Sequence, residues 1–482
     1  MINPEIPKGF KDYLPKEMIA RQHLVSIIQR VFERYGFLPL DTPSQEYALT
    51  LLGKGSPEMD KQIYRLRSPE GKDVGLRFDL TVPLARVVAQ YPNLPKPFRR
   101  YQISPVFRAE KPDPGRFREF IQADIDIVGS SLIASDAEII CIMYDTLKAL
   151  GISRFKIRVN NRKVLNSLAD FVKIPEDKKI AVFRVIDKLE KQGIDAIKEE
   201  LTSGRIDESG DKIAGLGLSF NKVERIMEFL SQERGNKREV ISSLKAFFSD
   251  FSEALSGINE LEELCAYLEA MEIPEESVVI DISIARGLDY YTGPVFEAIL
   301  QDAPEFGAVF AGGRYDELIK RFSGIELPGT GASLGVSRIL DALVKLNILK
   351  TPTSTTQVLV TVMEQDKISQ YKKVARELRL SGVNTELYVG NKGLSFQLQY
   401  ANAQEIPIAI IIGSNEFLND CVCVKDLRKG LKERFLVSGH KEWIEAGKKA
   451  QITVSRKDLV ETVKKMLFSF IKKGRKTTNG QG

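Results

Sequence analysis

Apolar residues recur at two different spacings in the first third of the chain. Residues 17–35 repeat them every three or four positions, which predicts an amphipathic helix that stops at Gly36. Helical spacing also appears over 135–150, and strand patterning predicts strands over 37–40, 98–110, 118–129 and 155–159. The second and third of these strands flank a Pro- and Gly-rich loop. We therefore expect an antiparallel hairpin with a long basic tip.

The middle of the chain, residues 174–275, has a different character. Lys, Glu, Leu and Ile recur there at helical spacing and strand patterning is almost absent, which predicts a mostly helical insertion. Strand patterning resumes over 277–284 and 295–300. After it we predict glycine-rich turns at 311–314 and 329–335, and a helix from about residue 335 to residue 348.

The pattern changes again after residue 350. Residues 351–356 are rich in Thr, Ser and Pro and are typical of a linker. Strands and helices then alternate over 357–470, which predicts an α/β domain with a largely parallel sheet. The polar residues 471–482 predict a disordered tail. The chain is therefore expected to be a multidomain α/β protein, with a first domain over 1–350 that contains the insertion.

Composition excludes several functional classes. A chain of 482 residues has room for two to four domains of ~100–200 residues. Its 43% hydrophobic and 28% charged residues are typical of a soluble globular protein, and no apolar run approaches the ~20 residues of a membrane helix. Residues 1–16 resemble neither a secretory signal nor a transit peptide, so we expect a cytoplasmic protein with no membrane partner. Only four Cys and two His argue against a disulfide scaffold, a zinc site or a His-based catalytic triad.

Basic residues concentrate in the last quarter of the chain. Residues 351–482 hold 22 Lys and Arg against 13 Asp and Glu, a net charge of +9, which leaves −4 for the rest. Such an excess fits a module that faces a polyanion. A lysine-rich solubilising surface fits the charge equally well.

Arginines cluster around the tip of the predicted hairpin. Arg108, Arg116 and Arg118 flank the loop, and guanidinium groups match phosphate oxygens bidentately. Phe120 offers a ring on which a purine could stack. From the spacing alone, a solvated charged hairpin explains this pattern somewhat better.

Two further segments combine glycine with groups that bind ligands. Residues 283–293 place Arg286 beside a glycine and then Tyr290 and Tyr291, although an ordinary turn with aromatic packing fits better in isolation. The glycine-rich segment before Arg338 matches neither the dinucleotide-binding fingerprint nor the P-loop. The predicted helix places Arg338 on its first turn, where it could reach a ligand over the sheet.

A fourth segment, residues 76–83, supports two interpretations. If it is a strand, Asp79 and Thr81 share one face and could meet an ammonium group. A helix N-terminus with Pro83 in the first turn is equally consistent, and both interpretations can hold together.

In this order, these segments resemble the class II histidyl-tRNA synthetases over about residues 9–467. Residues 36–43, 107–120 and 331–338 are similar to the three class motifs, and residues 285–293 and 311–316 resemble signatures of the histidine enzymes. Asp79 and Asp126 stand where the commonest bacterial branch carries Glu, but both types are carboxylates. The resemblance implies an antiparallel-sheet catalytic core with a helical insertion, followed by a C-terminal α/β anticodon-binding domain.

The resemblance also implies a role for each matching residue. The catalytic residues that it implies are Arg286, as the cation at the transition state, and Arg108, on the α-phosphate and the amino-acid carboxylate. The implied histidine-binding residues are Asp79, Leu80, Thr81, Arg108, Gln122, Asp126, Arg286, Tyr290 and Tyr291, of which Asp79, Thr81 and Gln122 hold the ammonium and Asp126 and Tyr291 the imidazole. The implied ATP-binding residues are Arg108, Glu110, Arg116, Phe120 and Arg338, with Phe120 and Arg338 on the two faces of adenine. No direct protein ligand of a metal is assigned.

The implied reaction has two steps. ATP, with Mg²⁺, activates L-histidine to histidyl-adenylate and pyrophosphate, and the histidyl group then moves to the 3′ end of tRNA(His). Motif 1 implies a homodimer, and the basic last domain would face the anticodon stem. Three related classes of protein are the alternatives: a regulatory subunit of ATP phosphoribosyltransferase, a sensor of uncharged tRNA, and another class II synthetase. The complete arginine set and the presence of residues 357–470 argue against the first rival.

Overall fold

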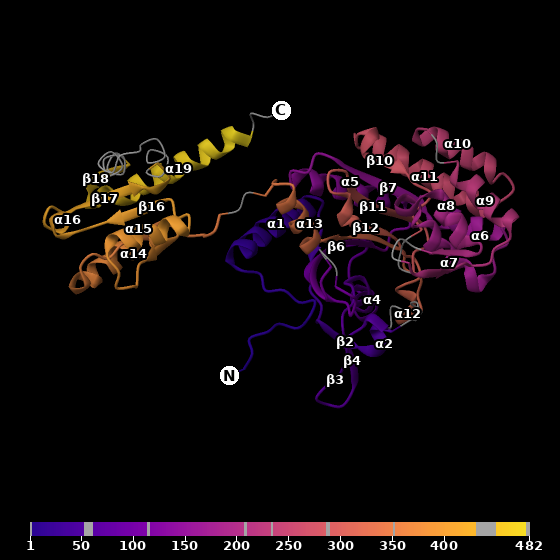
Figure 1. Cartoon of the computed structure of the whole chain (residues 1–482), viewed down its shortest axis with the longest axis horizontal. Coiled ribbons are helices and arrows are strands. Elements are labelled where there is room, and N and C mark those ends of the chain that lie inside the picture. The colour runs from indigo at the N-terminus through magenta and orange to yellow at the C-terminus, as the bar shows by residue number, and fades with distance from the viewer. Residues whose placement is uncertain are drawn as a thin grey trace. The chain divides into compact units, whose positions relative to one another are not determined.

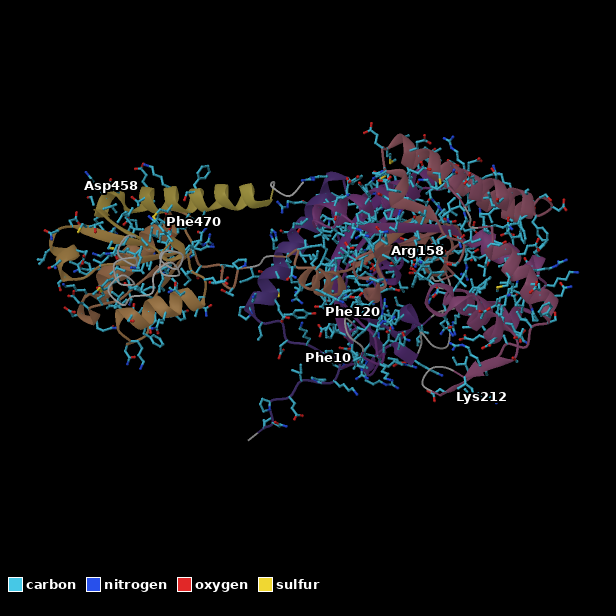
Figure 2. All side chains as sticks on the ribbon, turned by 45° about the horizontal axis from the view of Figure 1, so that its top comes forward. Phe10, Phe120, Arg158, Lys212, Asp458 and Phe470 are labelled. Atoms are coloured by element: carbon cyan, nitrogen blue, oxygen red, sulfur yellow. The ribbon has the colours of Figure 1, made fainter. Side chains whose placement is uncertain are left out.

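The computed structural model describes residues 2–52, 61–112, 116–206, 210–232, 235–285, 290–349, 352–429 and 450–478. The chain divides into two compact units, one of Met1–Asp12 and Arg21–Leu349 and the other of Tyr13–Ala20 and Lys350–Gly482. Figure 1 gives the elements of each unit, and Figure 2 gives their side chains, with Phe120 in the first unit and Asp458 in the second. Among the residues described, no helix has the length and apolar character that crossing a membrane requires.

The first unit is built on an eight-stranded sheet with the order β1-β5-β6-β13-β12-β11-β7-β10. Its pairs are antiparallel except at the two edges, where β1 pairs with β5 and β10 with β7 in parallel. The strands are β1 (Leu38–Pro39), β5 (Phe98–Phe107), β6 (Glu119–Val128), β7 (Phe155–Asn161), β10 (Val278–Ile280), β11 (Pro294–Leu300), β12 (Ala308–Arg314) and β13 (Gly329–Gly335). The predicted hairpin is thus confirmed as the pair β5–β6.

The two glycine-rich segments are strands at the middle of this sheet, where turns had been predicted. Glycine occurs in these strands because the neighbouring strands approach too closely to leave room for a side chain. A Cβ at Gly312 of β12 would lie 2.0 Å from the carbonyl oxygen of Gly331, and one at Gly331 of β13 would lie 2.2 Å from Oδ1 of Asp126. Glycine is therefore needed in these strands for packing, and not for chain reversal.

Helices and a small second sheet complete the first unit. Helix α5 (Ile133–Ala149) contacts β6, β11, β12 and β13, while α13 (Val336–Lys345) follows β13 and contacts β6. The sheet β2-β4-β3 packs against the short helix α2. The remaining elements here are α1 (Pro15–Arg34), of which the part from Arg21 on belongs to this unit, β2 (Gln45–Tyr47), α2 (Ala48–Leu51), β3 (Arg65–Arg67), β4 (Asp73–Leu76), α4 (Thr81–Gln90), η2 (Pro304–Phe306) and α12 (Lys320–Ser323).

The chain between β7 and β10 is mostly helical, as predicted. It comprises α6 (Arg162–Phe171), α7 (Glu176–Ile186), α8 (Leu189–Leu201), α9 (Phe220–Leu230), α10 (Lys237–Phe247), α11 (Ser252–Ala270) and η1 (Glu275–Ser277). A two-stranded hairpin, β8 (Gly204–Ile206) with β9 (Lys212–Ala214), was not predicted because its strands are only three residues long. The predicted strand over 277–284 is also shorter than expected. It ends at Ile280, because the side chain of Asp281 accepts a hydrogen bond from the backbone N–H of Ser283 and turns the chain.

The second unit is an α/β domain with the sheet order β15-β14-β16-β17-β18. Its first three strands are parallel and its last two antiparallel to their neighbours. Its elements are β14 (Val358–Val360), η3 (Gln365–Lys367), α14 (Ile368–Leu380), β15 (Thr385–Leu387), α15 (Leu394–Ala403), β16 (Ile408–Ile411), α16 (Ser414–Leu418), β17 (Cys421–Asp426), β18 (Gln451–Ser455), η4 (Arg456–Asp458) and α19 (Leu459–Thr478). Helix α19 extends into the segment predicted as a disordered tail from residue 471. Its Lys and Arg residues favour a helix and suit a helix C-terminus.

Candidate functional site

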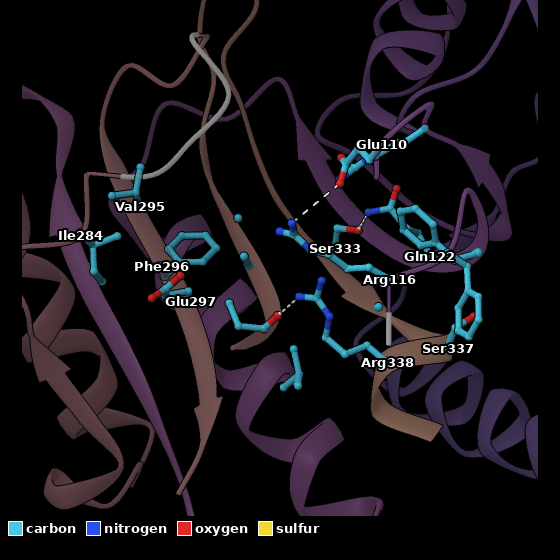
Figure 3. A pocket seen from close by; sticks show the side chains of 18 of the residues that line it. Glu110, Arg116, Gln122, Ile284, Val295, Phe296, Glu297, Ser333, Ser337 and Arg338 are labelled. Atoms are coloured by element: carbon cyan, nitrogen blue, oxygen red, sulfur yellow. Dashed lines mark hydrogen bonds and ion pairs between the residues drawn. The ribbon is translucent and has the colours of Figure 1, made fainter. Parts of the chain in front are cut away.

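A cavity of about 290 Å³ opens over the middle strands of the first unit. It is lined by residues from the end of β5 and the start of β6, from β11, β12 and β13, and from the first turn of α13 (Figure 3). Seven residues predicted from the sequence line it: Arg108, Glu110, Arg116, Phe120, Gln122, Tyr291 and Arg338. Arg286, the predicted catalytic cation, lies outside the described residues.

Arg108 stands at the end of β5 between two aromatic rings. Its guanidinium carbon lies 4.3 Å from the ring centroid of Phe78 and 5.2 Å from that of Phe120, and its Nε donates to the carbonyl oxygen of Phe78 at 3.2 Å. Burial lowers the pKa of Arg108, against the attraction of Glu110 and Asp79. An arginine remains charged at neutral pH even so. The two rings therefore hold a cation in a fixed place at the pocket.

Two more arginines face the same cavity from different walls. Arg116 at the hairpin forms an ion pair with Glu110 at 3.9 Å, and its side chain is 57% exposed. Arg338 lies on the first turn of α13, as predicted, and its Nη1 donates to the carbonyl oxygen of Ala308 at 2.5 Å. Figure 3 shows both guanidinium groups directed toward the cavity. The cavity thus presents three guanidinium groups, which suit a ligand with several phosphates.

Strand β6 supplies a row of polar side chains on one face. Gln122, Asp124 and Asp126 alternate with apolar residues along this strand, so they point the same way. Gln122 Nε2 donates to Ser333 Oγ, which in turn donates to Asp124 Oδ1. Gln122 Oε1 is buried and has no hydrogen-bond partner among the described residues. This oxygen is therefore available to a donor on a ligand.

Sequence reasoning missed Asp124. Its spacing from Gln122 and Asp126 along one strand could have indicated it. Burial raises the pKa of Asp124 to about 7, opposed by the charge of Arg100 and reinforced by the neighbouring charge of Asp126. The row therefore contains a carboxyl group that titrates near neutral pH.

Asp126, the predicted imidazole contact, is held by the protein itself. Its Oδ2 lies 2.8 Å from Arg100 Nη2, and its Oδ1 accepts a hydrogen bond from the hydroxyl of Tyr315. Burial raises the pKa of Asp126, while Arg100 and Tyr315 act to lower it. Tyr290 is edge-on to both Tyr291 and Tyr315, with ring centroids 5.1 and 6.0 Å apart. Asp126 and three tyrosines thus form one packed cluster beside the cavity.

The structure of Asp79 fits both interpretations made from the sequence, the helix N-terminus and the carboxylate that could meet an ammonium group. Its Oδ1 accepts hydrogen bonds from the backbone N–H groups of Thr81 at 3.1 Å and Val82 at 2.9 Å, at the start of α4. Its Oδ2 is buried with no hydrogen-bond partner in the described part of the chain. Burial raises the pKa of Asp79, against these backbone hydrogen bonds and the charge of Arg108. One oxygen therefore caps a helix, and the other is left for a cation.

Comparison with known proteins decides the family. The family model of histidyl-tRNA synthetase matches residues 9–339. The chain belongs to the histidyl-tRNA synthetase family. An anticodon-binding-domain model matches residues 357–466. This confirms the family resemblance and the predicted fold class.

Individual members of the histidyl-tRNA synthetase family match along nearly the whole chain. The histidine–tRNA ligase of Paracoccus denitrificans is 41% identical, covering 96% of this chain and 97% of its own. That of Jannaschia sp. is also 41% identical, over 89% and 90% of the two chains. The crystal structure of the histidyl-tRNA synthetase of Nostoc sp. superposes with a TM-score of 0.78 at 33% identity, covering 97% of this chain and all of that one. The chain is therefore an aminoacyl-tRNA synthetase.

Proposed function

We propose that the chain activates L-histidine with ATP and transfers the histidyl group to the 3′ end of tRNA(His). One observation carries the proposal within this family. The cavity brings three guanidinium groups, from Arg108, Arg116 and Arg338, beside Gln122 Oε1, a buried acceptor without a hydrogen-bond partner among the described residues. The charge of Asp79 also acts on Arg108. Phosphates and an α-amino group are the two chemistries that this arrangement binds.

The α-ammonium of histidine is held by Asp79 and Gln122, with Thr81 beside them. An ammonium group has three donors and no acceptor, so it satisfies the buried oxygens Asp79 Oδ2 and Gln122 Oε1 at once. A cation at this place also offsets the burial that raises the pKa of Asp79. An amino acid without a free ammonium would leave both oxygens unpaired, which is costly.

The imidazole ring lies against the cluster of Asp126, Tyr290 and Tyr291. Leu80 is linked to this cluster through Arg100, which donates to its carbonyl oxygen at 3.0 Å. Tyr291 lines the cavity, whereas Asp126 is anchored behind it by Arg100 and Tyr315. Hydroxyl and carboxylate groups in fixed positions distinguish a ring N–H from a ring nitrogen acceptor. They therefore reject apolar side chains of similar size, which would leave these polar groups unpaired.

ATP occupies the arginine-lined half of the cavity. Phe120 and Arg338 lie on the two faces of adenine, Arg108 holds the α-phosphate and the histidine carboxylate, and Arg116 meets the terminal phosphates. Mg²⁺ fits this half, since the carboxylate of Glu110 faces the cavity and its ion pair with Arg116 is long at 3.9 Å. The ion would neutralise charge on the phosphates.

The chemical step needs charge stabilisation and orientation, not a protein nucleophile. Attack of the histidine carboxylate on the α-phosphate builds negative charge on its oxygens, which Arg108 and Arg286 stabilise. The terminal ribose hydroxyl of tRNA then attacks the carbonyl carbon of the adenylate, and AMP leaves.

The rest of the chain serves tRNA binding and assembly in this proposal. Residues 1–350 are the catalytic domain, residues 351–356 the linker and residues 357–470 the anticodon-binding domain, whose basic surface contacts the anticodon stem. The enzyme is a cytoplasmic homodimer.

Amino-acid-dependent ATP–pyrophosphate exchange tests this function. We expect exchange with histidine alone among the twenty amino acids, and its loss in Arg286→Ala with the fold retained by circular dichroism. Measurable histidine binding without exchange for any amino acid would contradict the proposal and favour a regulatory subunit.

A further inference from the structure

A second cavity of about 250 Å³ adjoins the first at the base of the insertion. Ile284, Glu297 and Ala308 line both cavities, so they form a shared wall. The second cavity is also lined by Arg158 of β7 and by Glu190 at the start of α8. The wall of the proposed ATP pocket therefore meets the helical insertion at this place.

Arg158 holds three carboxylates that come from three separate parts of the chain. Its Nη1 lies 2.6 Å from Glu190 Oε2 and 3.1 Å from Asp281 Oδ2, and its Nη2 donates to Glu297 Oε1. Glu297 stands directly opposite Arg158 in the β7–β11 register. The side chains of Asp281 and Glu297 are each 7% exposed, whereas that of Glu190 is 61% exposed. The ion pairs with Asp281 and Glu297 are thus internal, and the third joins Arg158 to an exposed carboxylate of the insertion.

The same strand fixes the segment 281–285 through side chains. Asp281 Oδ1 accepts hydrogen bonds from the backbone N–H of Ser283 at 3.0 Å and from its hydroxyl at 2.5 Å. Asn160, which shares a strand face with Arg158, donates from Nδ2 to the carbonyl oxygens of Ile282 at 3.2 Å and Ile284 at 3.0 Å. Because β10 ends at Ile280, these contacts take over the role of strand pairing.

We propose that Arg158 is a positioning residue that ties α8 of the insertion to the wall of the adenylation pocket. It fixes Glu297 directly and, through Asp281, the segment that ends at Ala285, after which Arg286 follows in the sequence. The inference rests on the proposed function, in which Arg286 acts on the reacting phosphate. The placement of the insertion thereby sets the rate of adenylate formation.

A kink separates the turn that carries Glu190 from the rest of α8. Gly193, with φ 77° and ψ 168°, interrupts α8 after this turn. Any movement of the turn changes the Glu190–Arg158 contact before it disturbs the internal pairs. Asp79, just before α4, and Gln122, on β6, are the residues that we assign to the histidine ammonium. Among the described residues, the ion-pair partners of Arg158 are Glu190, Asp281 and Glu297 instead. A loosened wall should therefore lower kcat more than it changes the KM for histidine.

The test compares Glu190→Gln and Arg158→Lys with a matched control, Glu199→Gln, which changes an exposed carboxylate on the same helix. Histidine-dependent ATP–pyrophosphate exchange is measured per titrated active site, together with the thermal unfolding midpoint. We expect kcat to fall about 5-fold in Glu190→Gln and about 10-fold or more in Arg158→Lys. A small displacement of the pocket wall from the reacting groups is enough to slow the chemical step by such factors. KM for histidine should stay within about 2-fold in both, and Glu199→Gln should match the wild type. The midpoint of Glu190→Gln should not move, since exposed ion pairs add little stability.

Two results would overturn the inference while leaving the proposed function intact. One is a kcat for Glu190→Gln equal to that of Glu199→Gln. The other is an Arg158→Lys variant that loses only its unfolding midpoint, at unchanged kcat per active site, which would make the arginine purely structural. A wild-type enzyme without histidine-dependent exchange would overturn both this inference and the proposed function.

Discussion

Arg100 and Asp126 form an ion pair inside the first unit, 2.8 Å apart, with side chains that are 0% and 3% exposed. They stand opposite each other on β5 and β6, and Tyr315 donates to the second oxygen of the same carboxylate. The part of the pocket that we assign to the imidazole is therefore continuous with the buried core. Under this assignment, substrate recognition and folding would depend on the same charges.

Removing the negative partner should destabilise the fold. Asp126→Asn leaves the guanidinium of Arg100 buried without a countercharge, so we expect the free energy of unfolding to fall by about 3–5 kcal/mol. Urea unfolding measures it. The double variant Arg100→Met with Asp126→Asn should lose less than the sum of the two single losses. Simple additivity would show that the two charges do not act as a pair.

Asp79 allows its structural and ligand-binding roles to be separated. In Asp79→Asn the side-chain oxygen can still accept from the N–H groups of Thr81 and Val82, so stability should change by less than about 0.5 kcal/mol. Its amide NH₂ would instead face the ammonium, and kcat/KM for histidine should fall by about 100-fold, equivalent to a lost charged hydrogen bond. Asp79→Ala should add a stability loss of about 1 kcal/mol. Equal kcat/KM for wild type and Asp79→Asn would contradict the assignment.

Gly331 and Gly335 provide a matched pair on β13. A methyl group at Gly331 would meet Asp126 Oδ1 at 2.2 Å and the carbonyl oxygen of Ile125 at 2.4 Å, whereas at Gly335 its nearest neighbour is Arg338 Cβ at 3.5 Å. We expect Gly331→Ala to lower the unfolding free energy by about 1–3 kcal/mol or more through overpacking. Gly335→Ala should stay within about 1 kcal/mol. Thermal unfolding of the two variants compares them directly, and equal midpoints would show that β6 and β13 can move apart.

Asp124 should make stability depend on pH. Burial raises its pKa to about 7, so between about pH 4 and pH 7 the folded state keeps a proton that the unfolded state loses. The protonated carboxyl group is favoured in the fold, and its contribution is present at low pH and is lost as pH rises toward 7. Asp124→Asn should remove this part of the slope and raise the urea midpoint at pH 8 relative to the wild type. Parallel midpoint curves for both proteins from pH 5 to pH 8 would contradict the shifted pKa.

Elements with strong periodicity could be predicted from the sequence, and the contacts between them could not. The hairpin around Arg108 and the helix before Gly36 follow from local patterning. The sequence predicts turns where the glycine-rich strands lie, because glycine is usual in turns. Gly331 is instead required because Asp126, on the neighbouring strand and more than two hundred residues earlier in the chain, leaves no room for a side chain. Asp124 was missed for a related reason. Its importance comes from Ser333 across the sheet, and no local pattern indicates that pairing.

The strands that bracket the insertion, β7 and β10, are parallel neighbours. Two parallel neighbours cannot be joined by a tight turn, because the chain must return to the starting end of the sheet, which takes about a dozen residues or more. The helices between them are therefore also the crossover that brings β10 into place. A truncated version of this enzyme would need a replacement bridge of that length, and simple excision would remove an edge strand as well as the insertion.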